Sequence, residues 1–575
     1  MTKLIRFLKP FTPVITGVVL LVFLQSITDL YLPTLLSDIV DTGVIRGDTG
    51  YIWRTGGWML LVAAASAAAA VAASYLSSLV AAGFGRDLRR RVFARVESYS
   101  LHEFDKIGTA TLITRTTNDI TQVQMVLLLV LRMMISAPIM AVGGIAMAVS
   151  KDAELSLVLV VVLPLLVGLI TYVARRGIPL FKALQVKLDR LNLVLRENLT
   201  GIRVIRAFDR VDHERRRFQE TNADLTRTAT LVNQVMAVMM PTMMLIMNFT
   251  MVAIVWFGGV RISAGHMQVG DMMAFIQYAI QIMWSMVMLS MMFIMIPRAE
   301  ASAVRINEVL ETEAEINDPE QPRSPGGRHG YVEFRNVTFS YPGAEQPAVS
   351  GISFRAEPGQ TTAIIGGTGS GKSTLISLIP RFYDVERGAV LVDGVDVREM
   401  TQEALRRKIG FVPQQAVLFT GTIADNLRHG NPDASDEDIR KAAVTAQAME
   451  FISGMKNNFD AELEQGGMNL SGGQKQRLSI ARALVRRPEI YVFDDSFSAL
   501  DFKTDARLRS ALRKETADAT VIIVAQRVST VMDADQIIVL DDGQIAGIGT
   551  HQDLMKNCTV YREIVSSQLS EEELA

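Results

Sequence analysis

Long apolar stretches separated by charged segments dominate the first 300 residues of the chain. Each stretch is about 20 residues or longer, which is enough for one helix to cross a bilayer. They lie near residues 13–36, 56–82, 124–149, 154–174, 235–260 and 272–297. Farther along, short apolar runs such as Thr362–Ile365 and Ile490–Phe493 are typical of buried strands. The pattern predicts a multidomain protein with an all-α six-helix transmembrane domain followed by an α/β domain.

Composition agrees with this division. The chain has 575 residues, of which 49% are hydrophobic, and this is too apolar for a purely soluble protein. The segment Asn317–Gly330 is polar and rich in proline and glycine, as linkers are. We therefore expect a membrane domain over residues 1–318, a linker over 319–330 and a second domain over 331–575.

Basic residues set the expected orientation. They cluster after the second and fourth apolar stretches, so the positive-inside rule puts both connections in the cytoplasm. These residues are Arg86, Arg89, Arg90, Arg91, Arg95, Arg175, Arg176, Lys182, Lys187 and Arg190. The single cysteine, Cys558, excludes an intramolecular disulfide.

A glycine-rich loop follows the apolar run Thr362–Ile365. It fits the phosphate-loop pattern, in which backbone N–H groups surround phosphates, a lysine supplies charge to the outer phosphates and a hydroxyl suits Mg²⁺. The nine residues are Gly366, Gly367, Thr368, Gly369, Ser370, Gly371, Lys372, Ser373 and Thr374. A second apolar run ends in Asp494, which is placed to hold the Mg²⁺ shell. Together they predict an ATP site of the P-loop NTPase class.

Between these motifs lies Leu470-Ser471-Gly472-Gly473-Gln474. With this signature, nearly the whole chain resembles an ABC transporter half, in which one exporter-type membrane domain is joined to one nucleotide-binding domain. The resemblance implies ATP and Mg²⁺ as cofactors, with Ser373, Gln414 and Asp494 near the metal. It also implies a cytoplasmic nucleotide-binding domain.

The resemblance assigns further roles by position. Tyr341 matches the residue that stacks on adenine, and Gln414 matches the glutamine that relays the nucleotide state. Ser471, Gly472, Gly473 and Gln474 would contact the ATP held by a partner's phosphate loop. Leu101–Asp105 and Phe208–Arg210 fall where such exporters carry short coupling helices, which we expect near Gln414.

The chain departs from the family at two positions. Asp495 stands where a catalytic glutamate is usual, and its carboxylate is one methylene shorter; displacement by about 1 Å costs about a hundredfold in rate. Gln526 stands where the switch histidine is usual and cannot take up a proton. We expect weak hydrolysis at this chain's own site, and a partner that carries the glutamate and the histidine. The alternative is that Asp495 still works as a slow base in a homodimer.

Candidate substrate residues lie in the apolar stretches. Between residues 236 and 295 lie 16 of the 29 methionines, and such flexible side chains line surfaces that accept varied apolar shapes. Lipid-facing or helix-packing methionine is the alternative interpretation. Asp29 is a carboxylate at membrane depth, which suits a cationic substrate. The candidates are Asp29, Met243, Met247, Met288 and Met292.

The resemblance and the two departures favour one half of a heterodimeric multidrug-type exporter in a bacterial cell (inner or plasma) membrane. It would move small amphipathic compounds outward by alternating access, with a second ABC half-transporter and the lipid bilayer as partners and no nucleic acid. A homodimeric lipid or peptide exporter, an exporter-fold importer of a metal chelate, and an ATP-gated regulator or channel remain alternatives.

Overall fold

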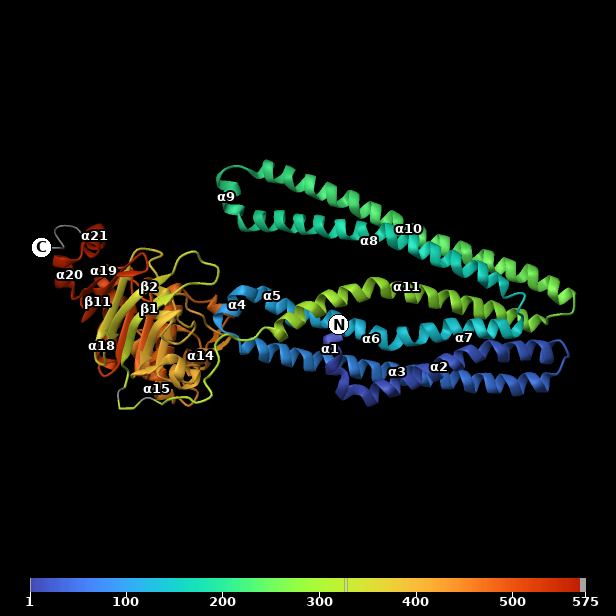
Figure 1. The fold of residues 1–575 in the computed structure, drawn as a ribbon, viewed down its shortest axis with the longest axis horizontal. Helices are drawn as coiled ribbons and strands as arrows, with labels where there is room; N and C mark the ends of the chain where they lie inside the picture. The colour runs from blue at the N-terminus through green and yellow to red at the C-terminus, as the bar shows by residue number, and fades with distance from the viewer. Residues whose placement is uncertain (1, 325, 328, 569–575) are drawn as a thin grey trace. The chain divides into compact units, whose positions relative to one another are not determined.

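The computed structural model describes residues 2–324, 326–327 and 329–568, and the chain divides into two compact units (Figure 1). One unit comprises Met1–Glu97 and Thr109–Thr312, and the other comprises Ser98–Gly108 and Glu313–Ala575. A short segment near residue 100 therefore belongs to the same unit as the C-terminal part of the chain. The limits 1–318, 319–330 and 331–575 stay a prediction.

All regular secondary structure in the described residues of the first unit is helical. Among its described residues, six helical runs are long and apolar enough to cross a membrane, which confirms the expected six-helix domain. The elements are α1 (Thr2–Ile5), η1 (Arg6–Phe11), α2 (Thr12–Asp38), η2 (Ile39–Val44), α3 (Thr49–Glu97), α5 (Thr109–Thr114), η3 (Arg115–Asp119), α6 (Ile120–Leu129), η4 (Val130–Met134), α7 (Ile135–Lys151), α8 (Leu157–Thr200), α9 (Ile202–Ala207), α10 (Val211–Ser263) and α11 (Val269–Glu311).

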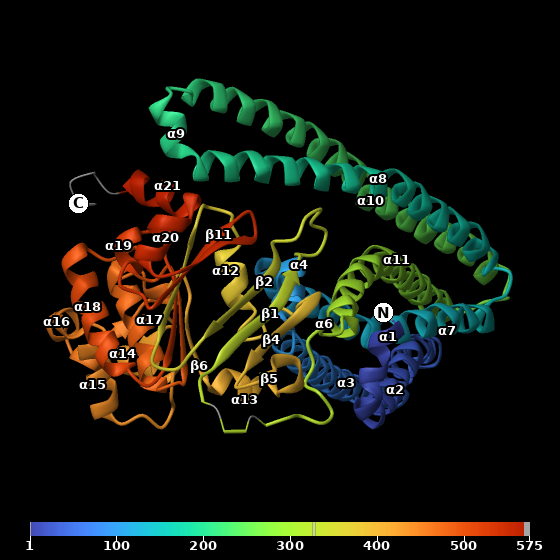
Figure 2. The same cartoon turned by 60° about the vertical axis from the view of Figure 1, so that its left-hand side comes forward.

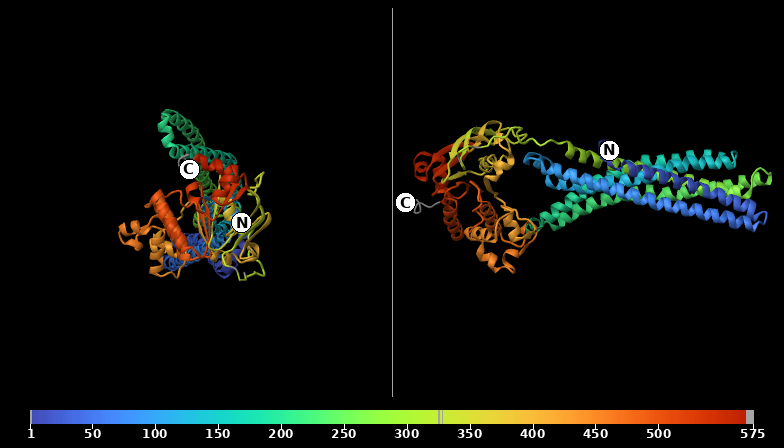
Figure 3. Two further views of the ribbon diagram at one scale, coloured as in Figure 1. Left: turned by 90° about the vertical axis from the view of Figure 1, so that its left-hand side faces the viewer. Right: turned by 90° about the horizontal axis from the view of Figure 1, so that it is seen from below.

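Helices α8 and α10 lie side by side along much of their length and are joined through α9 (Figures 1 and 3). The short helix ends at Ala207, and Asp209 takes a left-handed backbone conformation with φ of 49°. An aspartate tolerates this conformation because its short side chain bonds locally. Phe208–Arg210 thus forms the turn after the short helix, and the expectation that this segment is itself the helix was wrong.

Polar contacts tie the apolar helices of the first unit together. Lys151 at the end of α7 donates to the Asp271 carboxylate of α11 at 2.8 Å, and Ser37 of α2 donates to the same oxygen at 2.9 Å. Near the opposite end of α11, the Asp119 carboxylate of the π-helical η3 accepts from Ser302 at 2.9 Å and from Arg305 Nε at 2.7 Å. Because such bonds are directional, they fix which faces of the helices meet.

The second unit contains two main sheets (Figure 2). The six-stranded sheet has the order β12-β11-β3-β10-β9-β6, and its inner strands are parallel and buried. A four-stranded antiparallel sheet has the order β2-β1-β4-β5. The strands are β1 (Val332–Phe339), β2 (Val349–Ala356), β3 (Thr361–Gly366), β4 (Arg387–Val392), β5 (Val395–Asp396), β6 (Ile409–Val412), β7 (Gly421–Thr422), β8 (Glu462–Leu463), β9 (Ile490–Asp494), β10 (Thr520–Val524), β11 (Gln536–Asp541) and β12 (Gln544–Gly549).

Helices connect and cover these strands, as a parallel sheet requires. They are α12 (Lys372–Ser377), η5 (Val397–Glu399), α13 (Gln402–Arg407), α14 (Ile423–Arg428), α15 (Asp436–Thr445), α16 (Met449–Gly454), η6 (Asn458–Asp460), η7 (Gln465–Gly467), α17 (Gly472–Arg486), α18 (Phe502–Glu515), α19 (Val528–Val531), α20 (His551–Asn557) and α21 (Thr559–Gln568). The expected α/β domain is confirmed.

One further helix, α4 (Leu101–Ile107), belongs to this second unit. It begins with a capping box, because the Ser100 N–H donates to Glu103 at 2.7 Å. The same carboxylate accepts from the Glu315 N–H at 3.2 Å, and Tyr383 donates its hydroxyl to Asp105 at 3.1 Å. The contacts that hold α4 are thus with Tyr383 and Glu315.

We expect Phe334→Ala to destabilise the second unit, because the Phe334 side chain is 2% exposed and stacks on Phe354 with ring centroids 4.6 Å apart. Truncation of a buried phenylalanine costs about 3–5 kcal/mol, so the thermal midpoint should fall by roughly 10 °C. Calorimetry of the full chain measures this. Val444→Ala removes a side chain that is 54% exposed and should leave the midpoint unchanged.

Candidate functional site

The phosphate loop joins the end of β3 to the start of α12, as the sequence predicts. Gly369 and Gly371 have φ of 85° and 90°, a conformation that side chains disfavour. A Cβ at Gly371 would lie 2.5 Å from the Ala348 carbonyl oxygen. The loop therefore needs glycine at this position for both conformation and space, and residues 366–374 form one continuous strand–loop–helix segment.

Lys372 lies in the centre of this loop. Its side chain is buried, and its ammonium donates to the carbonyls of Gly366 at 3.0 Å and Gly367 at 2.6 Å. Burial lowers the pKa of Lys372, and the nearby carboxylates of Asp495 and Asp494 oppose that shift. The positive charge is thus held at the loop, near the two carboxylates at the end of β9.

Ser373 connects the loop to β9. Its hydroxyl donates to Asp494 Oδ1 at 2.9 Å, which brings together two of the predicted Mg²⁺ ligands. A hydroxyl and a carboxylate are hard oxygen ligands, and this donor set fits Mg²⁺, which takes its other ligands from phosphates and water. Burial raises the pKa of Asp494, while the bond from Ser373 lowers it.

Asp495 and Gln526 contact each other. Gln526 Nε2 donates to Asp495 Oδ2 at 3.0 Å, and Gln414 Nε2 approaches the same oxygen at 3.5 Å. Asp495 has φ of 44°, and burial raises the pKa of its carboxyl. The two residues that depart from the family pattern are therefore hydrogen-bonded partners, and Gln414 lies beside the Asp495 carboxylate.

Tyr341 lies at the other side of the loop. Its hydroxyl is 3.1 Å from the Thr374 hydroxyl, and its ring packs edge-on against Phe339 and Tyr383 at centroid distances of 5.1 and 5.5 Å. The Tyr341 side chain is 39% exposed. An exposed aromatic face beside the phosphate loop suits a nucleobase.

The signature residues form the N-terminus of α17. Ser471 caps the helix, and its backbone N–H in turn donates to the Gln474 side chain at 2.9 Å. In the first turn, Gly472 is exposed and Gly473 is partly buried. These four residues are a separate group from the Lys372–Asp494 cluster. An exposed helix N-terminus of this kind binds an anion brought by another surface.

The substrate candidates are dispersed. Asp29 accepts a hydrogen bond from the Ser66 hydroxyl of α3 at 2.5 Å, so its carboxyl group already has a hydrogen-bond partner within the helices. Met243 and Met247 are partly buried in α10, whereas Met288 of α11 is 38% exposed. The side chain of Met292 lies outside the described part of the structure. The structure does not bring these residues into one cluster through any contact among the described side chains.

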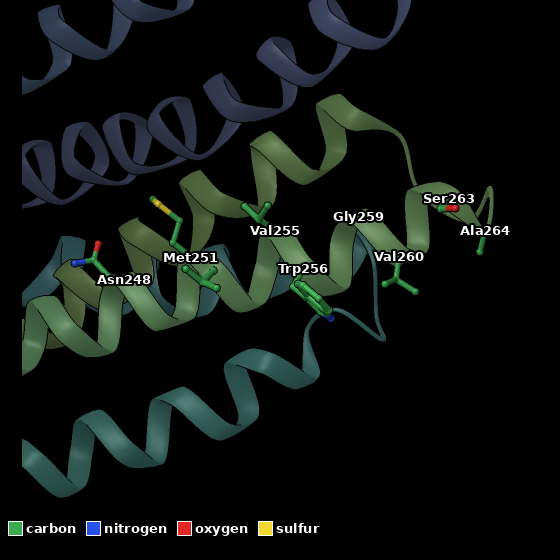
Figure 4. A pocket seen from close by; sticks show the side chains of 9 residues that line it. Asn248, Met251, Val255, Trp256, Gly259, Val260, Ser263 and Ala264 are labelled. Atoms are coloured by element: carbon green, nitrogen blue, oxygen red, sulfur yellow. The ribbon is translucent and has the colours of Figure 1, made fainter.

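An apolar groove of about 900 Å³ runs along one face of α10 (Figure 4). Met251, Val255 and Trp256 are among its lining residues, and all of them come from this helix or the turn after it. A groove with a single helical wall does not enclose a ligand, and most small-molecule sites are concave on several sides. The predicted methionines do not line it.

Sequence reasoning missed Gln476 and Tyr383, and it assigned no role of its own to Arg527, the neighbour of Gln526. Gln476, which is 3% exposed, donates to the Pro413 carbonyl at 3.3 Å and so supports the Gln414 loop. Arg527 donates to the Ser498 carbonyl at 3.0 Å. Tyr383 links Tyr341 to α4 through its ring and its hydroxyl. Gln476 and Arg527 adjoin recognised motifs, whereas nothing in the sequence singles out Tyr383.

Comparisons with known proteins agree with this geometry. The ABC transporter transmembrane region matches residues 15–286, and the ABC transporter model matches residues 349–498. An ABC transporter ATP-binding protein of Mycobacterium tuberculosis is 44% identical over 565 residues, which cover 98% of this chain and 97% of that protein. The ATP-dependent lipid A-core flippase of Chromobacterium violaceum is 30% identical over 569 residues, covering 99% and 97%.

The fold is also similar to a solved structure. A bacterial Atm1-family ABC exporter with ATP bound matches with a TM-score of 0.80 at 27% identity, covering 97% of this chain and 99% of that chain. The similarity extends over both units, so the six-span helical domain and the α/β domain occur together in that exporter.

We expect Asp495→Asn to raise the thermal midpoint at about pH 7.5, because burial disfavours the carboxylate. The folded-state pKa of Asp495 lies above that of the unfolded chain, so the free energy of unfolding falls as pH rises through the folded pKa. The gain from asparagine should therefore shrink as pH is lowered. Thermal unfolding of the full chain at several pH values measures it.

Asp553→Asn provides a control of opposite sign. Hydrogen bonds from the Thr550 side chain and backbone lower the pKa of Asp553, which is exposed. Its contribution to stability is present above the unfolded pKa and is lost as pH falls through the folded pKa. This variant should lower the midpoint slightly at neutral pH. An equal response of the two variants would contradict the assigned effect of burial at Asp495.

Proposed function

Because the chain belongs to the ABC transporter family and joins an exporter-type membrane domain to a nucleotide-binding domain, we propose that it is one subunit of a heterodimeric multidrug-type exporter. ABC exporters work as dimers in a lipid bilayer, and an ABC domain implies ATPase activity. In this proposal the partner is a different half-transporter that carries the catalytic glutamate and the switch histidine.

The hydrogen bond between Gln526 and Asp495 supports the proposal. A general base must lie within hydrogen-bond reach of the attacking water, and here the shortened carboxylate is bonded to a neutral amide that cannot take up a proton. The Lys372, Ser373 and Asp494 cluster that suits ATP and Mg²⁺ is complete beside it. A site equipped to bind but poorly equipped to cleave favours a division of work between two chains.

In this proposal, ATP on this chain's phosphate loop meets the partner's signature, and the partner's ATP meets Ser471–Gln474. Hydrolysis takes place mainly at the partner's phosphate loop. The α4 helix, held by Tyr383 and Glu315, transmits closure of the nucleotide-binding domains to the membrane helices. Small amphipathic compounds then leave a bacterial cell through the cell membrane by alternating access.

A homodimeric lipid exporter is the second candidate. It is favoured by the lipid A-core flippase of Chromobacterium violaceum, which matches this chain from end to end at 30% identity. In a homodimer, Asp495 would act as the base at two equivalent sites. The two candidates differ in whether this chain hydrolyses ATP without another half-transporter.

The decisive measurement is steady-state ATPase activity of this chain alone and with a candidate partner in lipid nanodiscs. We expect this chain alone to be nearly inactive and the pair to turn over. A Glu→Gln change at the partner's catalytic position should abolish turnover of the pair, by about a hundredfold or more. Asp495→Glu with Gln526→His should raise the activity of this chain alone.

Two controls make the assay interpretable. Lys372→Ala in this chain should weaken its own ATP binding and sets the background level. Brisk hydrolysis by the unmodified chain alone, lost in Asp495→Asn, would overturn the heterodimer in favour of the homodimer. Transport of a fluorescent amphipathic cation into inside-out vesicles, compared with transfer of a labelled lipid, separates the two substrate classes.

We further expect Tyr383→Phe to reduce transport more than ATP hydrolysis. The change removes the hydroxyl that donates to Asp105 at 3.1 Å, while the ring still packs against Tyr341. Loss of a hydrogen bond to a carboxylate is worth about 1.5–3 kcal/mol, so transport per ATP hydrolysed should fall roughly tenfold. Tyr491→Phe, a buried tyrosine in β9, serves as the matched control and should leave this ratio unchanged. An unchanged ratio in Tyr383→Phe would remove α4 from the coupling route.

A further inference from the structure

The segment 525–529, called the switch loop here, forms hydrogen bonds with several neighbouring segments. The Gln526 side chain donates to Asp495, and Arg527 donates to the Ser498 carbonyl at 3.0 Å. From α18, Arg509 donates to the Ser529 carbonyl at 2.9 Å. These contacts link the loop to the turn after β9 and to α18.

Gln568, at the end of α21, contacts the same loop through both groups of its amide. Its Oε1 accepts from the Val528 N–H at 2.9 Å, and its Nε2 donates to the Gln526 carbonyl at 2.8 Å. One side chain thus binds the backbone on both sides of Arg527, as a neighbouring strand would. The two short bonds restrain the peptide that carries the Gln526 side chain.

The helix that carries Gln568 is itself firmly packed. Tyr561 and Val565 of α21 are fully buried, and the Tyr561 hydroxyl lies 2.8 Å from His551 Nδ1 of α20. Gln568 is exposed at the end of this helix, where core packing does not require a particular residue. The structural contribution of the Gln568 side chain is therefore its two hydrogen bonds to the switch loop.

The loop that Gln568 restrains is hydrogen-bonded to the candidate nucleotide site. A chain of contacts runs from Ser373 to Asp494, to the adjacent Asp495 and then to Gln526. Lys372 lies near both carboxylates, and the lysine of a phosphate loop pairs with the outer phosphates of the nucleotide. We therefore expect Gln526 to lie toward the phosphate that ATP carries and ADP lacks.

We propose that Gln568 is a positioning residue for nucleotide recognition: it holds the switch loop so that Gln526 favours ATP over ADP at this chain's own site. Helix α21 is then a functional support of the nucleotide site. The inference concerns binding at one phosphate loop, so it holds whether the assembly is a heterodimer or a homodimer. It assigns Gln568 no direct contact with the nucleotide.

The test is calorimetric titration of the full chain in lipid nanodiscs with Mg²⁺ and either ADP or the non-hydrolysable ATP analogue AMP-PNP. Gln568→Ala removes both bonds, and we expect it to weaken AMP-PNP binding about three- to tenfold and ADP binding less than about twofold. Gln568→Glu keeps the acceptor for Val528 but cannot donate to Gln526, and it should also lose preference for AMP-PNP. Ser567→Ala, an exposed neighbour on α21, should bind both nucleotides normally.

The split between the two nucleotides separates positioning from general destabilisation. Equal weakening of ADP and AMP-PNP, or unchanged binding of both in Gln568→Ala, would overturn the proposal, and so would wild-type binding by Gln568→Glu. Thermal unfolding of each variant identifies loss of fold, in which case Gln568→Glu carries the test. Because binding is measured without turnover, the result stands apart from the question of which chain hydrolyses ATP.

Discussion

Parallel pairing of β3, β10 and β9 is the constraint on which the nucleotide site depends. The register that aligns Ile364 with Val524, and Val524 with Asp494, brings the phosphate loop, the switch loop and the Asp494 carboxylate to one edge of the sheet. The carboxyl ends of parallel strands share an edge of the sheet. The strand pairing alone therefore brings together three segments that are distant in sequence. The hydrogen bond from Ser373 to Asp494 is the direct result.

Much of this arrangement could be predicted from the sequence. The six apolar stretches and the motifs at Lys372, Asp494 and Ser471 are local patterns whose spacing carries their meaning. The partners of Tyr383 and Gln568 could not be predicted, because each bonds across a fold-dependent distance and belongs to no local motif. Phe208–Arg210 was misplaced since a one-turn helix and the turn after it have similar sequence signals.

Asp495 and Gln526, the two residues that depart from the family pattern, contact each other in the structure. In the sequence, Asp495 and Gln526 are separate departures from a family pattern, at two positions 31 residues apart. In the structure they are a bonded pair, with the amide donating to the carboxylate at 3.0 Å. A histidine and a glutamate at these positions would differ in length and in charge, so changing one residue alone leaves the other with an ill-matched neighbour.

The membership of α4 in the second unit bears on how the nucleotide-binding domain is studied in isolation. Its sequence neighbours α3 and α5 belong to the first unit, so the chain contributes Ser98–Gly108 to the second unit as a discontinuous piece. A fragment beginning at residue 313 would lack that piece. The Tyr383 hydroxyl and the Glu315 N–H would then bond to water, and the aromatic group next to Tyr341 would lose its neighbour on α4. Nucleotide affinities measured on such a fragment would describe a domain whose surface lacks the contacts with α4.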